Sequence, residues 1–356
     1  MILEYLRRKI LNKKTRPLEI TNRSKKNEKF YGLNFQYKTF GNKNPKKIFF
    51  IIRRTPGAGF FSNLCFVLHN LLICEKLKMI PVIDMENYPT IYNCKVKINN
   101  SYNAWSYYFK PVSNYKLNEV YQSKNVVLCD NKTSKNNLFN KINYTSNFKY
   151  FNGFQYLTKE HKKIFKKYIV INNKILDNVN NFCQKKFKGK ILGVCFRGTD
   201  QKKAGYHPYP ATEEQMLTAT NALIKKYKFD NIYICTEDIN YLNLYKKVYG
   251  NKILYYENPR TNDEKDLFDG IDKKHRYKIG LGNLIDMILL SKTDHLLYTM
   301  SNIPKASIFY TNKKNLPSSI IDNGMKGNIF ISQFSFYLRK VLPCYLGGFK
   351  KNILDL

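Results

Sequence analysis

Signatures of bound metal and of disulfides are missing from this sequence of 356 residues. The eight cysteines form no close pair and no Cys-x-x-Cys motif. Free thiols of this kind are typical of proteins in a reducing compartment, so we expect a cytoplasmic protein. No Asp-x-Asp motif occurs, which argues against phosphates bridged through a divalent metal. We therefore expect neither a metal nor another cofactor.

Long hydrophobic runs are also missing, since no stretch reaches 18 apolar residues and none is predicted to cross a bilayer. The N-terminus lacks the apolar region and the cleavage site of a signal peptide. Residues 1–11 instead place apolar side chains on one helical face beside Arg7, Arg8 and Lys9. This pattern predicts either an anchor on an anionic membrane surface or a helix packed on the protein body.

Acidic residues are scarce. The sequence has 26 aspartates and glutamates against 61 lysines and arginines, which gives a net charge of +35. Such an excess would attract nucleic acid or anionic lipid. The basic residues are spread along the chain and are not clustered with stacking aromatics. We therefore expect no nucleic-acid partner, although a basic nucleic-acid-binding protein remains an alternative. The positive charge also suits an anionic substrate.

Arginine is scarce in its turn, with 10 residues among the 61 basic ones, so each arginine calls for a specific reason. Arg197 follows the apolar segment 191–195, which we interpret as a buried parallel strand. In open α/β sheets the ligand crevice lies beyond the carboxyl ends of such strands. A guanidinium fork there suits a diphosphate. The alternative is a structural ion pair with Asp200 or another carboxylate.

Alternating strand and helix patterns define the expected fold class, α/β. The C-terminal half predicts a doubly wound parallel sheet, with strands near 189–197, 231–236, 252–256 and 295–300 and helices near 210–227, 239–249, 279–292 and 303–310. Earlier in the chain, a strand at 47–53, a helix at 62–77 and a strand at 79–84 predict a βαβ unit. Gly57 and Gly59 precede that helix and form either a phosphate-side turn or a plain turn.

Three sequence blocks, in order, resemble the nucleotide-sugar-binding segment of α-1,6 and nodulation-type fucosyltransferases. GVCFRGTD at 193–200, followed by His207-Pro208, is similar to the family pattern G-V-H-V-R-R-T-D-K ending in H-P. The strand ending at Glu237 and Asp238 resembles the family's A-T-D-D. The segment 284–302 resembles I-L-D-x-x-x-L-S-x-x-D-x-x-x-x-T-x-S-S. The resemblance implies a GT-B-like arrangement, in which two Rossmann-like domains face a cleft.

The resemblance also implies roles for individual residues. Arg197 would bind the β-phosphate, and Ser301 with nearby backbone N–H groups would bind other phosphate oxygens. Asp286 would face guanine, unless it caps backbone or pairs with Arg276. Donor binding would further involve Glu237 and Asp238 on the base and ribose side, although Asp238 also fits a helix N-cap.

The chain departs from the family pattern at several positions. Cys195 replaces the base-contacting histidine, Gly198 replaces a second arginine, and Gln201 replaces a lysine. The glutamate proposed as the family's catalytic base has no counterpart. The candidates for this role are Asp200, His207 and a carboxylate of the N-terminal domain, namely Asp84 or Glu86.

The sequence as a whole predicts an inverting fucosyltransferase that uses GDP-fucose without metal. Its acceptor would be a glycan or lipid-linked glycan for the cell surface, and its location would be cytoplasmic or peripheral on the membrane. The alternatives are a glycosyltransferase with another nucleotide sugar and a non-catalytic sugar-binding relative. The expected parts are a basic lead-in (1–45), an acceptor-side α/β domain (46–180), a nucleotide-sugar domain (181–325) and a tail that packs back (326–356).

Overall fold

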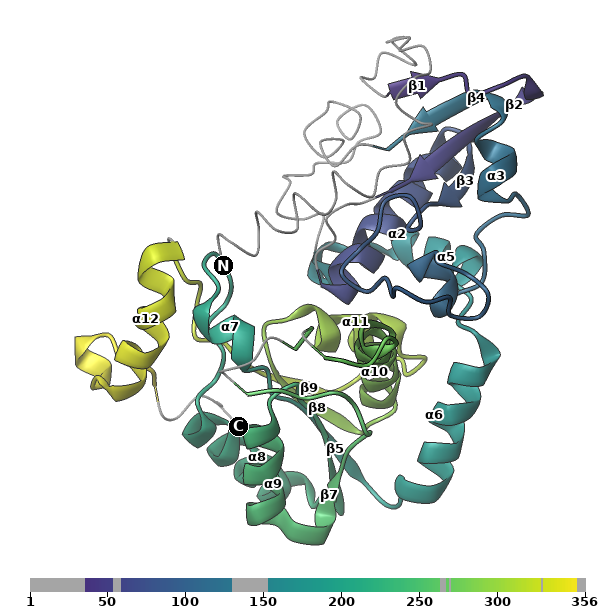
Figure 1. Ribbon diagram of the computed structural model, residues 1–356. Helices are drawn as coiled ribbons and strands as arrows, with labels where there is room; N and C mark the ends of the chain where they lie inside the picture. The colour runs from purple at the N-terminus through teal and green to yellow at the C-terminus, as the bar shows by residue number, and fades with distance from the viewer. Residues whose placement is uncertain are drawn as a thin grey trace. The chain divides into compact units, whose positions relative to one another are not determined.

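The computed structural model describes residues 36–53, 59–129, 153–262, 267–268, 270–327 and 329–350. The chain forms two compact units, which Figure 1 shows in ribbon form. Unit 1 ends at Asn173 and also takes in Asp272–Gly280, whereas unit 2 comprises Lys174–Ile271 and Leu281–Leu356. The expected boundary at residue 180 falls inside a continuous helix, α6 (Asn173–Lys186), all but the first residue of which belongs to unit 2.

Unit 1 contains a four-stranded sheet in the order β1-β4-β2-β3. Its strands are β1 (Gln36–Lys38), β2 (Lys43–Ile52), β3 (Ile80–Ile83) and β4 (Ser123–Leu128). β2 pairs in parallel with both β3 and β4, while β1 is an antiparallel edge strand. The predicted βαβ unit is present, with α2 (Phe60–Lys76) as its helix. β1 and the start of β2 lie in the segment expected to be a lead-in. Their polar residues gave no strand signal in the sequence, because backbone pairing does not require apolar side chains.

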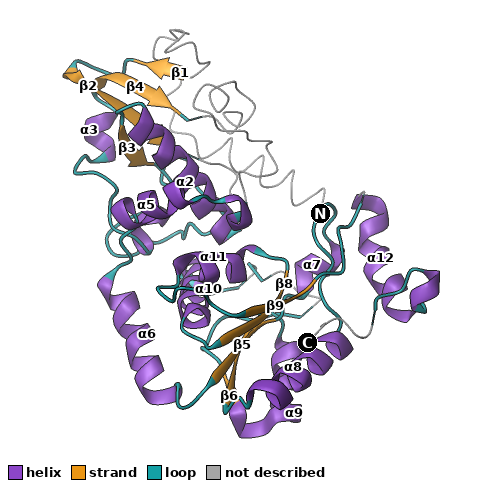
Figure 2. Cartoon of the chain, turned by 180° about the vertical axis from the view of Figure 1, so that it is seen from behind, coloured by secondary structure: helices purple, strands orange, loops and turns teal. Residues whose placement is uncertain are grey.

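The two faces of this sheet are covered differently. α2 packs on one face and is itself covered by α5 (Lys159–Tyr168), as Figure 2 shows, so nearly every residue of α2 is buried. The other face carries a smaller apolar cluster that includes Phe49, Ile51 and Val120. Its helix, α3 (Leu117–Val120), has only four residues. The connection from β3 to β4 is otherwise irregular apart from the 3₁₀ turn η2 (Ala104–Tyr107).

Unit 2 contains a five-stranded parallel sheet in the order β7-β6-β5-β8-β9. The strands are β5 (Ile191–Cys195), β6 (Asn231–Cys235), β7 (Ile253–Leu254), β8 (His295–Thr299) and β9 (Ser318–Ile321). Helices α8 (Glu213–Tyr227) and α9 (Ile239–Tyr249) lie on one face, and α10 (His275–Ser291) and α11 (Asn302–Tyr310) lie on the other (Figure 1). The doubly wound parallel sheet expected for this half of the chain is confirmed.

Apolar packing and capping explain why these elements form where they do. One apolar core of unit 2 lies between the sheet and helices α8 and α9, and includes Leu192, Leu223 and Ile234. Thr212 and Gln215 form a capping box that begins α8. The described residues of the tail form α12 (Ile329–Val341) and η7 (Cys344–Leu346). They pack on unit 2, where Phe336 and Phe349 bury Tyr209.

A buried histidine pair joins α2 to α5. His161 Nε2 lies 2.9 Å from His69 Nδ1, and the other ring nitrogen of His161 forms a capping box with Thr158. Burial lowers the pKa of His161 from its ordinary value of 6.5 to about 4. The folded protein therefore holds this imidazole neutral at a pH where an unfolded chain would protonate it.

We expect unfolding to become easier as the pH falls through this window. Between pH 7 and pH 5 His161 binds a proton in the unfolded chain but stays neutral in the folded protein. By linkage, this difference lowers the free energy of unfolding by about 2 kcal/mol. Urea unfolding of His161→Gln should lack this loss, whereas His275→Gln should retain it. Equal pH dependence in the wild type and His161→Gln would contradict the assignment.

Candidate functional site

Strand register brings Arg197 and Glu237 together. Cys195 in β5 pairs with Cys235 in β6, so the residues two positions beyond each cysteine leave the sheet side by side. Arg197 Nε lies 3.5 Å from Glu237 Oε1, and the arginine side chain is 23% exposed. This is the ion pair considered above as an alternative, with Glu237 as the carboxylate. Because Nε makes the contact, Glu237 fixes the orientation of the guanidinium group at the end of β5.

The same carboxylate oxygen holds the start of α7 (Thr199–Lys203). Glu237 Oε1 accepts hydrogen bonds from Gly198 N at 3.0 Å and from Thr199 Oγ1 at 3.2 Å. Thr199 has a φ of 31°, a left-handed conformation that β-branched residues rarely adopt. Backbone strain of this kind persists only where the surroundings enforce it, and it gathers at functional sites. Glu237 therefore holds a strained turn and an arginine in one place.

A buried ion pair lies behind this turn. Lys202 Nζ is 3.3 Å from Asp238 Oδ2, and both residues are buried. Asp238 also caps α9 by accepting from Asn240 N at 3.0 Å, so the N-cap considered for it is present. A Cβ atom on Gly198 would lie 2.8 Å from Asp238 Oδ2. The glycine that replaces the family's second arginine is thus required by the close approach of Asp238.

Unpaired oxygen atoms gather where β8 turns into α11. Ser301 occupies the N-cap position of α11, yet its hydroxyl makes no capping hydrogen bond. The hydroxyls of Ser301 and Thr299 are buried and have no partner in the part of the chain that the structure describes. The same is true of Gln201 Oε1, although Gln201 Nε2 donates to the carbonyl oxygen of Met300 at 3.2 Å. A buried polar group left unpaired costs about 1–3 kcal/mol, so this cluster favours a ligand.

The position of these groups in the sheet matches the usual ligand site of doubly wound folds. The strand order reverses at β5, whose neighbours are β6 on one side and β8 on the other. Ligands bind beyond the carboxyl ends of the strands at such a switch point. Arg197 follows β5, Thr299 ends β8, and Ser301 caps the helix that follows β8. The N-terminus of α11 adds backbone N–H groups that favour an anion.

A second buried network surrounds Asp286 on α10. The hydroxyl of Tyr233 donates to Asp286 Oδ1, and Asn258 Nδ2 donates to Oδ2 at 2.8 Å. Cys235 lies near Asp286 and pairs with Cys195 across β5 and β6. The two residues expected at the base thus both lie next to Cys235. Arg276, considered above as a partner of Asp286, instead donates to the Ile91 carbonyl oxygen in unit 1 at 3.1 Å.

Burial dominates the electrostatics of this network. It raises the pKa of Asp286 from 3.8 to about 6, against the opposing effects of the Tyr233 hydrogen bond and the Arg260 charge. The hydrogen bond with Cys195, together with burial, raises the pKa of the Cys235 thiol well above its ordinary range. The pKa of the Asp286 carboxyl group therefore lies near neutral pH.

Other predicted site residues lie apart from these clusters or outside the described residues. His207 is an exposed loop residue whose carbonyl oxygen accepts from Lys326 N at 2.9 Å. Gly59 caps α2 in unit 1 with a φ of −57°, and a Cβ there would meet nothing within 4 Å, so its backbone shows no need for glycine. Gly57, the side chain of Asp200 and the possible membrane anchor at 1–11 lie outside the described residues.

The two candidate bases in unit 1 differ sharply. Asp84 is fully buried and accepts hydrogen bonds from the Tyr121 hydroxyl at 2.6 Å and from Asn87 Nδ2 at 3.0 Å, as well as from two backbone N–H groups. It therefore organises the turn after β3. The carboxylate of Glu86 accepts no hydrogen bond from the described residues, and burial raises its pKa. Glu86 alone of this pair retains oxygens for a substrate.

Sequence reasoning missed part of the site. Thr299 carried the same signal as Arg197, because it is a polar residue that ends an apolar strand. Tyr233 and Asn258 carried no such signal: a tyrosine is ordinary within a strand, and Asn258 lies in an irregular segment after β7. These two residues belong to the site only because both donate hydrogen bonds to Asp286, which lies on α10.

No cluster of three or more His, Cys, Asp or Glu side chains that could hold a metal ion occurs among the described residues. Where anion-binding groups gather at the end of β5 and β8, they are an arginine, hydroxyls and backbone N–H groups. Such donors can neutralise phosphate oxygens directly. This arrangement can bind an anionic group without a bridging ion.

Comparisons with known proteins found similarity only among solved structures. No protein-family model and no curated protein matches the chain. The fucosyltransferase NodZ from Bradyrhizobium is 15% identical, with a TM-score of 0.46 over 74% of this chain and 93% of that one. POFUT1 in complex with GDP-fucose is 9% identical, with a TM-score of 0.42 over 79% of this chain and 99% of that one. At TM-scores below 0.5, these similarities assign no substrate and no residue role to this chain.

Replacing Asp286 should change the pH dependence of stability in the opposite direction to His161. Its raised pKa means that ionisation of Asp286 disfavours the folded state. The contribution of this group to stability is therefore fully present below about pH 4 and is lost as the pH rises through about 6. From pH 5 to 7.5 this loss amounts to about 1 kcal/mol. Urea unfolding of Asp286→Asn should lack it, whereas Asp294→Asn should keep it. A loss of the same size in Asp286→Asn would refute the assigned pKa.

Proposed function

We propose that this protein is an inverting, metal-independent fucosyltransferase that transfers fucose from GDP-fucose to a glycan acceptor in cell-surface polysaccharide synthesis. The observation that supports this most directly is the switch point of unit 2. There an arginine oriented by Glu237 follows β5, and the unpaired hydroxyls of Thr299 and Ser301 lie at and just beyond the end of the neighbouring strand β8. The choice of fucose and guanine rests on the three sequence blocks described above.

The proposed chemistry follows from the leaving group. The acceptor hydroxyl attacks the anomeric carbon from the face opposite the diphosphate, so the new bond forms as the bond to the β-phosphate oxygen breaks. The diphosphate leaves with the electron pair, and the acceptor proton passes to a base. Arg197, the hydroxyl groups and the N-terminus of α11 stabilise the negative charge that develops on the leaving oxygen. A dissociative transition state of this kind needs little help from the base.

The proposed reader of the guanine base is Asp286. Each of its oxygens already accepts a hydrogen bond, but an ionised carboxylate offers about four acceptor positions. Because the pKa of Asp286 is about 6, the ionised form that accepts from guanine N–H groups is lost as the pH falls below that value. The runner-up is another nucleotide sugar, which Cys195 in place of the family's histidine keeps open. Thermal-shift measurements with GDP, UDP, CMP and dTDP distinguish the two.

Arg197 provides the central test. In assays with GDP-fucose and excess EDTA, Arg197→Ala should raise the barrier by about 3–4 kcal/mol, as loss of one oxyanion donor does. Arg197→Lys should recover little of this, because a lysine lacks the planar fork. The same conservative change at Arg339, which bonds the Gly347 carbonyl oxygen on the tail, should leave turnover unchanged.

Glu237→Gln should fall between these variants, since the amide oxygen still accepts from Gly198 and Thr199 but no longer carries the charge that orients the arginine. Activity of Arg197→Ala within about tenfold of the wild type would overturn the proposal. A strict requirement for added manganese would overturn its metal-independent form.

We further propose that the protein associates with an anionic membrane surface through α12. The side chains of Ile331, Phe334, Leu338 and Val341 share one face of this helix and are 57–78% exposed. Phe336, on another face, is buried against the protein body, so the helix is apolar on both sides. A helix of this kind is normally covered. The net charge of +35 favours an anionic lipid surface as the cover.

No helix in the described part of the chain meets the length and hydropathy needed to span a bilayer.

Acidic substitutions on this face should release the protein from vesicles. We expect the double variant Phe334→Glu, Leu338→Glu to lose most of its co-sedimentation with vesicles of phosphatidylglycerol and phosphatidylcholine, because charge on the face that would enter the lipid opposes insertion. Ile271→Glu, at an exposed apolar residue outside α12, should bind like the wild type. Unchanged vesicle binding of the double variant would contradict the proposal. Loss of a concentration-dependent dimer instead would identify the cover as a second copy of the chain.

A further inference from the structure

A hollow in unit 1 lies on the face of the sheet that carries α3. It has a volume of about 810 Å³, within the range of about 300–1,000 Å³ typical of small-molecule sites. The hollow exists because the β3–β4 connection contains only a four-residue helix and a 3₁₀ turn on this side. Val82 and Ile83 of β3 line it together with residues of that connection. A full crossover helix would fill the same space.

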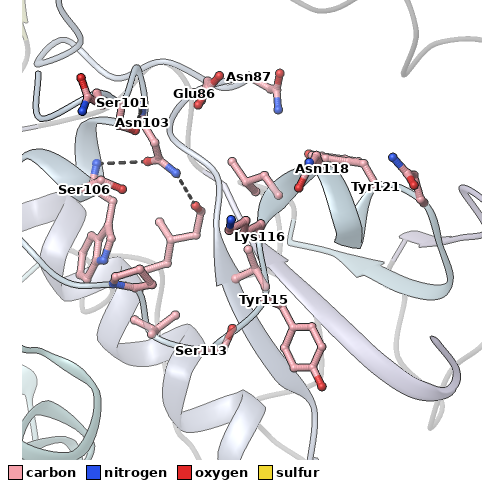
Figure 3. A pocket seen from close by; sticks show the side chains of 18 of the residues that line it. Glu86, Asn87, Ser101, Asn103, Ser106, Ser113, Tyr115, Lys116, Asn118 and Tyr121 are labelled. Carbon is pink, nitrogen blue, oxygen red and sulfur yellow. Dashed lines mark hydrogen bonds between the residues drawn. The ribbon is translucent and has the colours of Figure 1, made fainter. Parts of the chain in front are cut away.

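The lining of this pocket is almost uncharged, in contrast to the rest of the chain. Its charged residues are Glu86 and Lys116, one of each sign, although the sequence has 61 basic and 26 acidic residues. Most other polar lining groups are amides and hydroxyls, such as those of Asn118 and Ser106. In Figure 3, Glu86 and Asn87 lie along one side of the pocket, and Ser113 and Tyr115 lie across from them. A pocket whose lining has no net charge favours a neutral polar ligand over a nucleotide.

Two lining groups accept no hydrogen bond from the described residues. The hydroxyl of Ser113 is buried without a hydrogen-bond partner among them. Glu86 is exposed, and partial desolvation together with the nearby Asp84 raises the pKa of its carboxyl group. Ser113 can both donate and accept, whereas an ionised Glu86 can only accept. Hydroxyl groups of a ligand would satisfy both.

The walls around these groups are held rigidly. Asn103 Nδ2 donates to the Ile83 carbonyl oxygen at 2.8 Å, and its Oδ1 accepts from Trp105 N at 3.1 Å, as the dashed lines in Figure 3 show. Asp84 anchors Asn87 and the hydroxyl of Tyr121. Aromatic residues at the wall, including Tyr115, supply apolar surface beside the amides. A fixed mixture of apolar rings and hydrogen-bonding groups matches a sugar, which presents C–H faces and a rim of hydroxyls.

We propose that this pocket of unit 1 binds a neutral oligosaccharide, with Glu86 and Ser113 as ligands for its hydroxyl groups. The inference rests on the geometry of unit 1 alone. Combined with the proposed transferase function, it assigns the pocket to the glycan acceptor and makes that acceptor uncharged where it is held. Donor and acceptor would then be recognised by different units with opposite electrostatic character.

The test measures saccharide binding without any donor. Ligand-observed NMR titrations with neutral oligosaccharides of glucose, galactose, mannose and N-acetylglucosamine should identify a binder, whereas uronic-acid or sulfated oligosaccharides of equal length should not bind this pocket. Glu86→Gln should weaken the identified binder roughly tenfold or more, because hydrogen bonds to a charged acceptor are strong. Glu160→Gln, the same change on α5 outside the pocket, should bind like the wild type.

Ser113→Ala separates a binding role from a structural one. Removing an unpaired buried hydroxyl should leave the melting temperature unchanged or raised while saccharide affinity falls severalfold. Absence of binding by every neutral oligosaccharide at millimolar concentration, or affinity in Glu86→Gln equal to that of Glu160→Gln, would overturn the proposal. The thermal shift by GDP, measured on the same preparations, tests the donor site separately: saccharide binding without a GDP response would sink the proposed transferase and leave this pocket standing.

Discussion

The site in unit 2 depends on one carboxylate oxygen. Glu237 Oε1 receives the backbone N–H of Gly198, the hydroxyl of Thr199 and the guanidinium of Arg197, which are three consecutive residues. Without this acceptor, the turn between β5 and α7 would lose what offsets the positive φ of Thr199. The arginine would lose its orientation at the same moment. Parallel register alone places Glu237 within reach, because β5 and β6 pair cysteine with cysteine just before the site.

Elements with a continuous apolar or helical pattern could be predicted from the sequence. β5, β6, β8, α9 and α11 lie within a residue or two of the expected ranges, because each buries a full face in unit 2. β1 and the first half of β2 carry charged and polar residues, and long-range pairing alone makes them strands. The return of residues 272–280 to unit 1 has no local signature either, since α10 is one continuous helix across that division.

The candidate site could be predicted from the sequence only where a polar residue interrupts or directly follows an apolar segment. Arg197 and Asp286 stand out in sequence because each places polarity where apolar residues are expected, whereas Ser301 and Glu237 were indicated by the resemblance. The contacts between residues could not be predicted, since strand register brings Glu237 to Arg197 and an irregular segment brings Asn258 to Asp286. Gly198 illustrates the same limit: its departure from the family pattern becomes intelligible only when Asp238 is seen to occupy the space of a Cβ.

Charge distinguishes the two proposed ligand sites more clearly than shape does. At the switch point of unit 2, an arginine and the N-terminus of α11 favour an anion. The pocket in unit 1 has one positive and one negative residue in a chain with a net charge of +35. The residues at the first site therefore favour a diphosphate more than the lining of the second does, while a neutral sugar would gain hydrogen bonds at the second. Under the two proposals above, this difference would let a strongly basic protein hold an uncharged glycan in unit 1 and its anionic donor in unit 2.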